Sequence, residues 1–432
     1  MAGWPVFSGF GAGSQEPPGP LPEAAPWGGM GYTGEMAKWL LRGGLLVLAC
    51  VAGFTACRLM WPDAYVFNAP IRSTLIAASV RVPSEELFGR RIRAAEGFSA
   101  SLYAEVPGAR ILVATEAGDL LVSSPQQSAV LLLERDGDGD GRPDGQRALL
   151  SELDRPHGLD LRDGWLYIAE GSALGRIRFD VQAGRVQGEL ERIVTGLPNG
   201  GNHWRRMVRA GPDGWLYAAI GSSCNVCFEK DERRGAMLRF RPDGSGGHIY
   251  ATGLRNSSGY DWQPGSGDLY ATDNGRDLLG DDFPPCELNL VVEDGDYGWP
   301  VANGARVLDP DLGAGFEARA LASIPPAFDF PAHNAPLGIR FLRHAPPGYE
   351  NSALVGLLGS WNRTKKDGYK VVSLHWAPDG TIRSRDFLWG FLEDEDVIGR
   401  PVDAAETPDG AIFISDDYAG AVYRVVWRGE SN

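Results

Sequence analysis

A short phrase that recurs six times along the chain constrains the fold more than any other feature. Each copy is a turn, often Asp-Gly, followed by a short apolar strand with aromatic residues and then by Gly or Asp. The copies are ILVATEAG from 111, WLYIAEG from 165, WLYAAIG from 215, DLYATDNG from 268, ALVGLLGS from 353 and AIFISDD from 411. A strand repeat with a period near 50 residues is typical of a propeller blade of about four strands.

Six copies predict an all-β, six-bladed β-propeller over residues 91–430. The chain's 58 glycines and 30 prolines lie between short apolar runs, which indicates many tight turns. A sandwich or two β domains is the alternative, but the even spacing and the lack of a long amphipathic helix disfavour it. One interval of 85 residues contains an insertion after Asp273, on loops of the kind that carry function in a rigid ring.

The first 57 residues differ from the rest of the chain. Residues 1–35 are rich in Gly, Pro and Ala, and we expect a disordered extension. Residues 36–57 begin with basic residues and continue as a short apolar run that ends at Cys57, a pattern that fits a secretory signal. The ending Phe-Thr-Ala-Cys resembles a bacterial lipobox, so lipid anchorage at Cys57 and a simple N-terminal membrane anchor stay open. We predict a linker over 58–90.

These features predict an exported protein of the periplasm or cell envelope. The net charge of −15 argues against nucleic-acid binding, which needs a basic face.

Two cysteines, Cys224 and Cys227, stand in the motif CNVC. The next residue is Phe228 rather than His, which excludes a c-type haem attachment motif. Two cysteines do not complete a closed zinc site. We predict a local disulfide in an exported protein, with two free thiols as the alternative. Cys286 has no evident partner.

The stretch 253–300 combines cationic and oxygen-donor residues. Arg255 and Asn256 follow a short apolar segment. The oxygen donors further along are Asp273, Glu287 and Tyr297. Hydrogen-bond donors next to a binding site for a hard cation suit a small anionic, oxygen-rich ligand or cofactor.

His203 stands on a predicted loop before the third repeated strand. An unperturbed pKa near 6.5 would suit a general base at neutral pH. A surface or packing role is the alternative. His157 and His333 also precede strands and are the next candidates.

An acidic loop, DGDGDGRPD, alternates carboxylates with glycines and resembles the first part of an EF-hand loop. Its carboxylates are Asp136, Asp138, Asp140 and Asp144. We predict Ca²⁺ binding there. The closing bidentate Glu of an EF-hand is absent, so a solvated hairpin turn is the alternative.

Several cations accompany the last repeated strands. Arg363 and Lys370 follow the fifth repeat, and Arg400 precedes the sixth. With Arg255 they would make one face cationic, which suits a ligand that carries carboxylates. Ordinary surface charge is the alternative for each.

In this order, the motifs resemble the quinoprotein glucose/sorbosone dehydrogenases, and in particular their L-sorbosone dehydrogenase-like branch. The resemblance covers about residues 90 to 430. The matching segments are His203 nine residues before Pro212, GLRN at 253–256, Glu287-Leu288-Asn289 and Tyr297-Gly298-Trp299-Pro300, with GSSCNVC and GSWNR typical of the sorbosone-type branch. The resemblance implies a six-bladed propeller that uses pyrroloquinoline quinone (PQQ) and Ca²⁺.

The resemblance also implies roles for single residues around the quinone. His203 corresponds to the catalytic base. Arg255 and Asn256 correspond to the pair that contacts the quinone, and Arg255 would stabilise charge on it. Arg400 corresponds to a contact with a PQQ carboxylate.

Calcium sites follow from the same resemblance. The carbonyls of Gly275 and Arg276 correspond to the site of the PQQ-bound Ca²⁺, and Glu287 with the carbonyl of Tyr297 corresponds to a second site. The chain departs from the family in three places. Arg276 replaces a common Pro, Val402 stands where a second Arg often occurs, and GSWNR replaces the segment with a quinone-binding Lys.

The expected activity is oxidation of a sugar, or of a sugar-derived aldehyde or alcohol, by His-assisted hydride transfer to PQQ. An unidentified quinone or cytochrome would accept the electrons. Two alternatives stay open. One is a redox-inactive propeller that binds a partner or glycan at the cell envelope, and the other is a Ca²⁺-dependent lactonase-type hydrolase.

Overall fold

The computed structural model describes Gly44 and residues 66–70 and 82–429. The extension predicted at 1–35 lies outside these residues, as does the signal segment predicted at 36–57, including Cys57, apart from Gly44.

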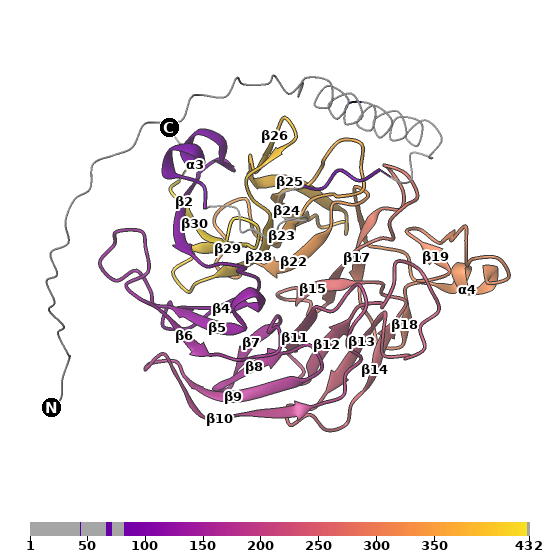
Figure 1. Ribbon diagram of the computed structural model, residues 1–432, viewed down its shortest axis with the longest axis horizontal. Helices are drawn as coiled ribbons and strands as arrows, with labels where there is room; N and C mark the ends of the chain where they lie inside the picture. The colour runs from indigo at the N-terminus through magenta and orange to yellow at the C-terminus, as the bar shows by residue number, and fades with distance from the viewer. Residues whose placement is uncertain (1–43, 45–65, 71–81, 430–432) are drawn as a thin grey trace, which may run out of the picture. The chain divides into compact units, whose positions relative to one another are not determined.

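The described residues form a six-bladed β-propeller, as the repeat predicted (Figure 1). The first blade consists of β3 (Leu112–Ala114), β4 (Leu120–Ser124), β5 (Ala129–Leu133) and β6 (Gln146–Leu150). The second blade consists of β7 (Leu159–Arg162), β8 (Trp165–Ala169), β9 (Leu174–Asp180) and β10 (Arg185–Val194). The third blade consists of β11 (Arg206–Ala210), β12 (Leu216–Ile220), β13 (Ala236–Phe240) and β14 (His248–Thr252), with β18 (Gly295–Asp296) at its edge.

The other three blades follow the same antiparallel order. The fourth blade consists of β15 (Ser257–Trp262), β16 (Leu269–Asp273), β17 (Cys286–Leu290) and β21 (Phe328–Phe330). The fifth blade consists of β22 (Pro336–Phe341), β23 (Ser352–Leu357), β24 (Lys370–Trp376) and β25 (Ile382–Trp389), with β1 (Arg93–Ala94) at its edge. The sixth blade consists of β28 (Pro401–Glu406), β29 (Ile412–Asp416) and β30 (Ala421–Trp427), with β2 (Phe98–Glu105) as its outer strand.

The ring closes through the sixth blade, which takes its outer strand from the other end of the chain. β2 pairs antiparallel with β30, so Phe98 lies opposite Trp427 and the two rings pack edge to face at 5.0 Å. Pairing between the two ends leaves no open gap in the ring, and apolar contacts across the closing pair stabilise it.

A short helix, α3 (Glu85–Arg91), lies within the segment predicted as a linker. Ser84 begins it, because its hydroxyl accepts a hydrogen bond from the Leu87 amide. Phe88 is buried against Tyr423 of β30, with the two rings 5.3 Å apart. The end of the predicted linker therefore packs on the sixth blade.

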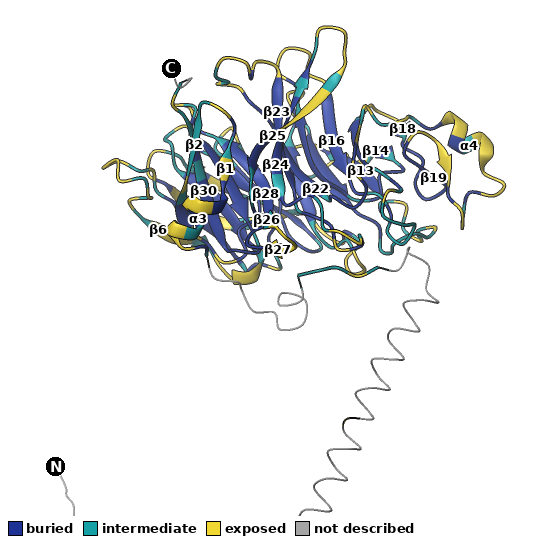
Figure 2. Ribbon diagram, turned by 90° about the horizontal axis from the view of Figure 1, so that it is seen from above, coloured by how far each residue is buried: buried dark blue, intermediate teal, exposed yellow. Residues whose placement is uncertain are grey.

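The innermost strands lie side by side around the axis of the ring, namely β3, β7, β11, β15, β22 and β28. Outer strands such as β6 and β10 are largely exposed (Figure 2). The second strands are buried on both faces, as β4, β12 and β16 show. Burial between blades explains why these segments read as continuous apolar runs and not as alternating patterns.

Five of the six repeated phrases fall on the second strand of a blade, namely β8, β12, β16, β23 and β29. The first phrase, from 111, falls on β3, the innermost strand of its blade. Its structural counterpart is β4, a few residues later. Both strands are short, apolar and preceded by turns, so sequence alone does not separate them.

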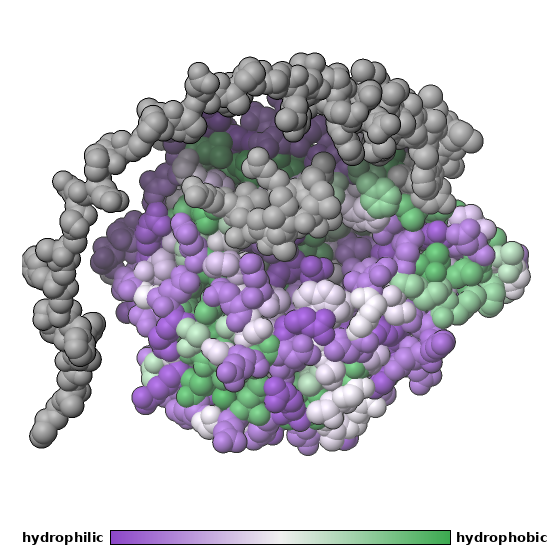
Figure 3. All heavy atoms as spheres, viewed as in Figure 1, coloured by the Kyte–Doolittle hydropathy of each residue, from purple (hydrophilic) through white to green (hydrophobic). Residues whose placement is uncertain are grey.

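The insertion in the longest repeat interval protrudes from the side of the ring (Figure 1). It contains the small hairpin of β19 (Ala302–Asn303) and β20 (Val307–Leu308) and the helix α4 (Glu317–Ala322). Figure 3 shows hydrophobic residues on this projection. A second small hairpin, β26 (Leu392–Glu393) and β27 (Asp396–Val397), precedes the sixth blade, and a 3₁₀ turn spans Pro125–Gln127. No helix among the described residues is long and apolar enough to cross a membrane.

Candidate functional site

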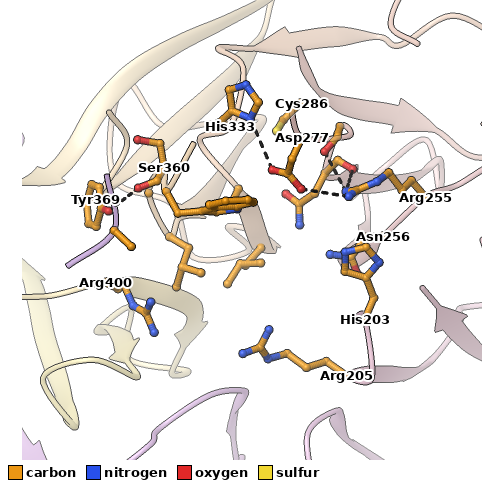
Figure 4. Close-up of a pocket in the computed structure, with 18 of the residues that line it drawn as sticks. His203, Arg205, Arg255, Asn256, Asp277, Cys286, His333, Ser360, Tyr369 and Arg400 are labelled. Carbon is orange, nitrogen blue, oxygen red and sulfur yellow. Dashed lines mark hydrogen bonds and ion pairs between the residues drawn. The ribbon is translucent and has the colours of Figure 1, made fainter. Parts of the chain in front are cut away.

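One cavity of about 440 Å³ collects the predicted site residues that come from different blades (Figure 4). His203 lines it from the loop before β11, and Arg400 lines it from the loop before β28. Arg255, Asn256 and Gly275 line it from the fourth blade and its connections. Loops at the ends of inner strands converge on the ring axis, so residues far apart in sequence share this cavity.

His203 presents one free ring nitrogen. Its Nδ1 lies 3.0 Å from the Ser222 carbonyl oxygen and 2.8 Å from the Ser222 hydroxyl oxygen. The hydroxyl donates its own hydrogen to the Cys224 carbonyl, so Nδ1 carries the ring proton. No described residue forms a hydrogen bond with Nε2, which is therefore an unprotonated acceptor.

The surroundings of His203 keep it neutral. Burial, and next the charge of Arg255, lower the pKa of His203 to about 3, well below the ordinary value assumed from the sequence. The imidazole is therefore unprotonated at any pH above that value, which leaves Nε2 with a free lone pair. Close packing also fixes the ring, because a Cβ on Gly221 would lie 2.6 Å from the His203 Cβ.

Arg255 is almost fully buried and is surrounded by oxygen atoms. Its Nη1 donates to the carbonyls of Asn274 (2.9 Å) and Gly275 (2.8 Å), and its Nη2 forms an ion pair with Asp277 at 3.2 Å. Its backbone amide donates to Asp273 at 2.8 Å. These contacts hold the guanidinium group rigidly at the wall of the cavity.

Asn225, in the CNVC motif, is the residue that joins these groups. Its side-chain oxygen accepts from Arg255 Nη2 and from the Asp277 amide, both at 2.8 Å, and its Nδ2 donates to the Asp277 carbonyl at 3.0 Å. Its own carbonyl accepts from Arg255 Nε at 2.8 Å. The predicted disulfide between Cys224 and Cys227 is present and closes this loop.

We expect Asn225→Ala to weaken binding of a ligand to Arg255. The variant removes the side-chain hydrogen bond to the charged Arg255 and the two hydrogen bonds to the backbone of Asp277. The dissociation constant of the bound ligand should therefore rise on the order of 10-fold. Val226→Ala is the matched control, since it shortens a side chain in the same disulfide-closed loop. Calorimetric titration with PQQ checks this, and equal affinity for both variants would remove Asn225 from the site.

The residues predicted to hold the PQQ-bound Ca²⁺ point in different directions. The carbonyls of Asn274 and Gly275 face the cavity wall, where both accept from Arg255, and the carboxylate of Asp277 lies beside them. Arg276, whose carbonyl was predicted as the second ligand, is not among the residues that line the cavity, and its side chain points to Asp309 at 2.8 Å. A carbonyl oxygen has a second lone pair, so Gly275 with Asp277 offers the hard oxygen donors that Ca²⁺ takes.

Glu287 and Tyr297 lie outside the cavity lining. Glu287, on β17, accepts from the Gly304 amide at 2.9 Å and from Asn289 Nδ2 at 3.0 Å. Burial, and next the charge of Asp273, raise the pKa of Glu287 to about 8. The Tyr297 hydroxyl donates to the Leu290 carbonyl at 2.6 Å. A buried carboxylate with a raised pKa lacks a counter-charge, which is the condition that a bound cation relieves.

This raised pKa predicts a pH-dependent stability of the metal-free protein. Between about pH 4.5 and 8 the unfolded chain releases the Glu287 proton while the folded protein retains it, so stability falls as pH rises. If Glu287 is a ligand, Ca²⁺ should raise the melting temperature at pH 8. Glu287→Gln should reduce that pH dependence and weaken calcium binding on the order of 10-fold.

Thermal unfolding at pH 5 and pH 8, with and without calcium, measures both effects. Glu189→Gln, an exposed carboxylate on β10, is the control. Equal calcium stabilisation of wild type and Glu287→Gln would show that Glu287 is no ligand.

Arg363 and Lys370 are not among the residues that line the cavity. Arg363 donates to the carbonyls of Asp281 and Ala332, and Lys370 forms an ion pair with Asp386 of β25 at 2.6 Å. Arg400, in contrast, lines the cavity, where its Nη2 pairs with Asp417 at 3.0 Å.

The acidic loop brings three of its four carboxylates together. Oxygens of Asp136, Asp138 and Asp144 lie within 4.8 Å of one another, while Asp140 is not part of this group. Arg424 already pairs with Asp136 at 2.7 Å, and loop amides donate to each of the three. The loop connects β5 and β6, away from the cavity lining.

The two alternative histidines differ in position. His157 is buried outside the lining, with Nδ1 3.1 Å from the Arg206 carbonyl and Nε2 accepting from Arg110 at 3.3 Å. Both of its nitrogens are therefore engaged. His333 does line the cavity, where Nε2 donates to the Gly280 carbonyl at 2.8 Å. The Nδ1 of His333 lies 3.6 Å from the Asp277 carboxylate. Of the two histidines in the lining, His203 is therefore the one with a ring nitrogen that forms no hydrogen bond or ion pair with a described residue.

Sequence reasoning missed several lining residues. Arg205 lies two residues after the predicted His203, and Asp277 directly follows the predicted Arg276. The HWRR motif was a visible signal for Arg205. Phe67, on the segment 66–70, packs against Trp361 with ring centroids 5.1 Å apart, and both line the cavity. Nothing in the sequence connects these two aromatic residues. Cys286 is a free, buried thiol in the same lining.

The sequence of this chain is similar to that of known proteins. A family model described as glucose/sorbosone dehydrogenase matches residues 167–424. A curated protein of Borreliella burgdorferi, described as uncharacterized, is 32% identical over 295 residues, which cover 64% of this chain and 76% of that protein.

Solved structures share the fold at low identity. A family AA12 carbohydrate-active enzyme from Trichoderma reesei aligns over 81% of this chain and 100% of its own, with 20% identity and a TM-score of 0.69. The PQQ domain of pyranose dehydrogenase from Coprinopsis cinerea, in its holo form, aligns over 81% and 98%, with 19% identity and a TM-score of 0.66. PQQ-bound aldose sugar dehydrogenase from Streptomyces coelicolor aligns over 77% and 99%, with 21% identity and a TM-score of 0.55.

Proposed function

Because the chain belongs to the glucose/sorbosone dehydrogenase family, we propose that it is a PQQ- and calcium-dependent oxidoreductase that oxidises a sugar or a sugar-derived aldehyde or alcohol. The observation that carries this proposal is the pairing of a neutral imidazole with a buried guanidinium in one cavity. His203 offers an unprotonated Nε2, and Arg255 offers a fixed positive charge.

The cavity suits a flat, acidic cofactor. Arg205, Arg255 and Arg400 line it, while Asp277 is the one carboxylate among the lining residues. Apolar side chains complete the wall, including Leu337, Leu358 and Trp361. Arginine binds carboxylates through paired donors, and PQQ carries three carboxylates on a planar ring system.

Each residue then has a chemical task. When bound, PQQ supplies the acceptor for a hydride. His203 accepts the proton of the substrate hydroxyl at Nε2, because Nδ1 is already protonated and held by Ser222. Arg255 stabilises negative charge on an oxygen near its guanidinium. Gly275 and Asp277 would hold Ca²⁺ beside the quinone.

The hydrolase alternative fits the cavity less well. A lactonase-type propeller holds a central metal with several side-chain carboxylates and Asn residues. The lining contains one carboxylate, Asp277, whereas such a metal site needs several. A protein that only binds a partner needs no general base, so the partner-binding alternative does not explain the free Nε2 of His203 in the cavity.

Export to the periplasm or cell envelope, with anchorage through Cys57 as one form of it, is part of the proposal. It rests on the composition of residues 36–57. A quinone or cytochrome there would receive the electrons.

A dye-reduction screen tests the proposed function. Protein reconstituted with PQQ and Ca²⁺ is mixed with a panel of aldoses and aldehydes and an artificial electron acceptor. We expect at least one substrate to reduce the dye only when PQQ is present. A protein that binds PQQ and reduces no dye with any substrate would support the partner-binding alternative.

A further inference from the structure

A short segment ahead of the propeller, residues 66–70, forms part of the cavity wall. Phe67, Ala69 and Pro70 of this segment line the cavity. The match to the glucose/sorbosone dehydrogenase family model begins at residue 167, so the segment lies outside the matched residues. It therefore gives the cavity a surface that the matched part of the chain does not supply.

Asn68 fixes the segment to the rest of the cavity wall. Its backbone amide donates to the Trp361 carbonyl at 2.7 Å. Its side-chain nitrogen donates to the Thr364 carbonyl at 3.0 Å and to the Glu395 carboxylate at 2.8 Å. Its side-chain oxygen accepts from Lys366 Nζ at 2.8 Å. Both ends of one amide side chain thus attach the segment to the loop after β23 and to the turn between β26 and β27.

The residue before Asn68 carries a large aromatic side chain that stays accessible. Phe67 packs against Trp361, with ring centroids 5.1 Å apart. Phe67 nevertheless remains 66% exposed and Trp361 36% exposed, and both line the cavity. Exposed apolar side chains that gather at a cavity mark a surface for a bound molecule. We call Phe67 and Trp361 the aromatic pair.

The aromatic pair belongs to the side of the cavity that faces the general base. Figure 4 shows Ser360 and Tyr369 across the cavity from His203 and Arg255. The Tyr369 hydroxyl donates to the Ser360 carbonyl at 2.6 Å, which fixes the chain directly before Trp361. A molecule that extends across the cavity from His203 therefore meets the aromatic pair at its other end.

We infer that Phe67 is a sugar-contacting residue, positioned by Asn68, whose ring stacks on the C–H face of the substrate. The inference rests on the proposed function, since that function makes a sugar-class molecule the occupant of the cavity. The face of an aromatic ring is electron-rich, and the C–H groups of a sugar ring are polarised positively by the neighbouring oxygens. Stacking covers these C–H groups and leaves the hydroxyls at the edge of the sugar ring to the polar wall.

Steady-state kinetics with a sugar from the dye-reduction screen test the contact. Phe67→Ala and Phe67→Leu should each raise KM about 3- to 30-fold. The value of kcat should change little, because stacking acts alike on the bound substrate and on the transition state. Phe67→Trp keeps an aromatic face and should stay close to wild type. Phe316→Ala, which removes an exposed aromatic side chain outside the cavity lining, is the control.

Two results would overturn the contact. One is a wild-type KM in both Phe67→Ala and Phe67→Leu. The other is a loss of PQQ affinity in these variants that matches the rise in KM, because it would assign Phe67 to the cofactor and not to the sugar.

Asn68 tests the positioning role separately. Asn68 is not among the residues that line the cavity, so Asn68→Ala should raise KM only by releasing Phe67. The double variant Phe67→Ala, Asn68→Ala should then have the KM of Phe67→Ala alone, since the two residues act as one unit. Losses that add in the double variant would overturn the positioning role of Asn68.

Saturation-transfer NMR of the apoprotein with methyl β-D-glucopyranoside separates this inference from the proposed function. The hydrogens on carbons 1, 3 and 5 of this probe share one face of the sugar ring. That face should receive the strongest saturation from the wild-type protein and lose it in Phe67→Ala.

The inference and the proposed function can fail separately. A wild-type protein that shows this contact but neither binds PQQ nor oxidises a sugar supports the inference and contradicts the proposed function. A wild-type protein that oxidises sugars, but whose Phe67→Ala variant keeps both the KM and the saturation pattern, overturns the inference alone.

Discussion

His203→Ala is expected to lower turnover by about 10²- to 10⁴-fold while PQQ binding stays close to wild type. The variant removes Nε2, the free acceptor nitrogen that we assign to the substrate proton, and leaves the arginines of the cavity in place. Single-turnover reduction of bound PQQ, followed by its absorption spectrum, measures the proton-dependent step directly. Ser222→Ala is the matched control, because the carbonyl that also accepts from Nδ1 remains.

The pH profile gives a second check on the same residue. With the pKa of His203 at about 3, the imidazole is neutral above roughly pH 4, so its protonation should not limit the wild-type rate between pH 5 and 9. A His203→Ala protein that reduces PQQ at the wild-type rate across pH 6 to 9 would assign the base elsewhere. His333 would then be the next candidate, since it lines the same cavity.

Arg255→Ala is expected to impair folding stability, cofactor binding and turnover together. The variant removes the hydrogen-bond donor of the Asn274 and Gly275 carbonyls, and it leaves Asp277 without the arginine of its ion pair. Removing one member of a buried charge network costs about 3–5 kcal/mol. Loss of the positive charge that we assign to quinone binding should also raise the PQQ dissociation constant about 100-fold or more.

The variant Arg255→Lys separates the effect of the positive charge from the effect of the planar guanidinium group. Lysine keeps the positive charge but lacks the planar fork that donates to several oxygens, so it should recover part of the PQQ affinity and little of the stability. Thermal unfolding of the apoprotein and calorimetric titration with PQQ report the two effects independently. Wild-type PQQ affinity in folded Arg255→Ala would remove Arg255 from the cofactor site.

The repeat allowed the sequence to predict the fold because each blade contributes a strand buried on both faces. Such strands read as apolar runs between Gly and Asp turns, and their spacing gives the blade count. The assignment of the first phrase to β3 shows the limit of this signal. Two adjacent short apolar strands, β3 and β4, lie at different distances from the axis, and an apolar run between turns does not show that difference.

The site was predictable where motifs lie next to inner strands, as for His203, Arg255 and Arg400. It was not predictable where function depends on the direction of a side chain. In the HWRR motif, Arg205 lines the cavity, whereas Arg206 is buried and donates to the His203 carbonyl at 2.9 Å. Lys370, at the start of β24, pairs with the neighbouring strand. Adjacent residues that point to opposite sides look equivalent in a sequence.

Asn225 shows a second kind of limit. Its partners Arg255 and Asp277 lie 30 and 52 residues away, so no local pattern marks the contact. The CNVC motif identified the disulfide, but the importance of the loop depends on long-range contacts that only the folded ring creates.

We propose that this cavity binds PQQ and that a sugar-class substrate transfers a hydride to it. The most direct measurement is the absorption spectrum of the apoprotein titrated with PQQ and Ca²⁺, purified by gel filtration and then mixed anaerobically with an aldose or aldehyde. We predict that PQQ co-elutes with the protein and changes to its reduced spectrum with at least one substrate, and that Arg255→Ala retains far less of it. PQQ that elutes separately from the wild-type protein, or stays oxidised with every substrate, would contradict the claim.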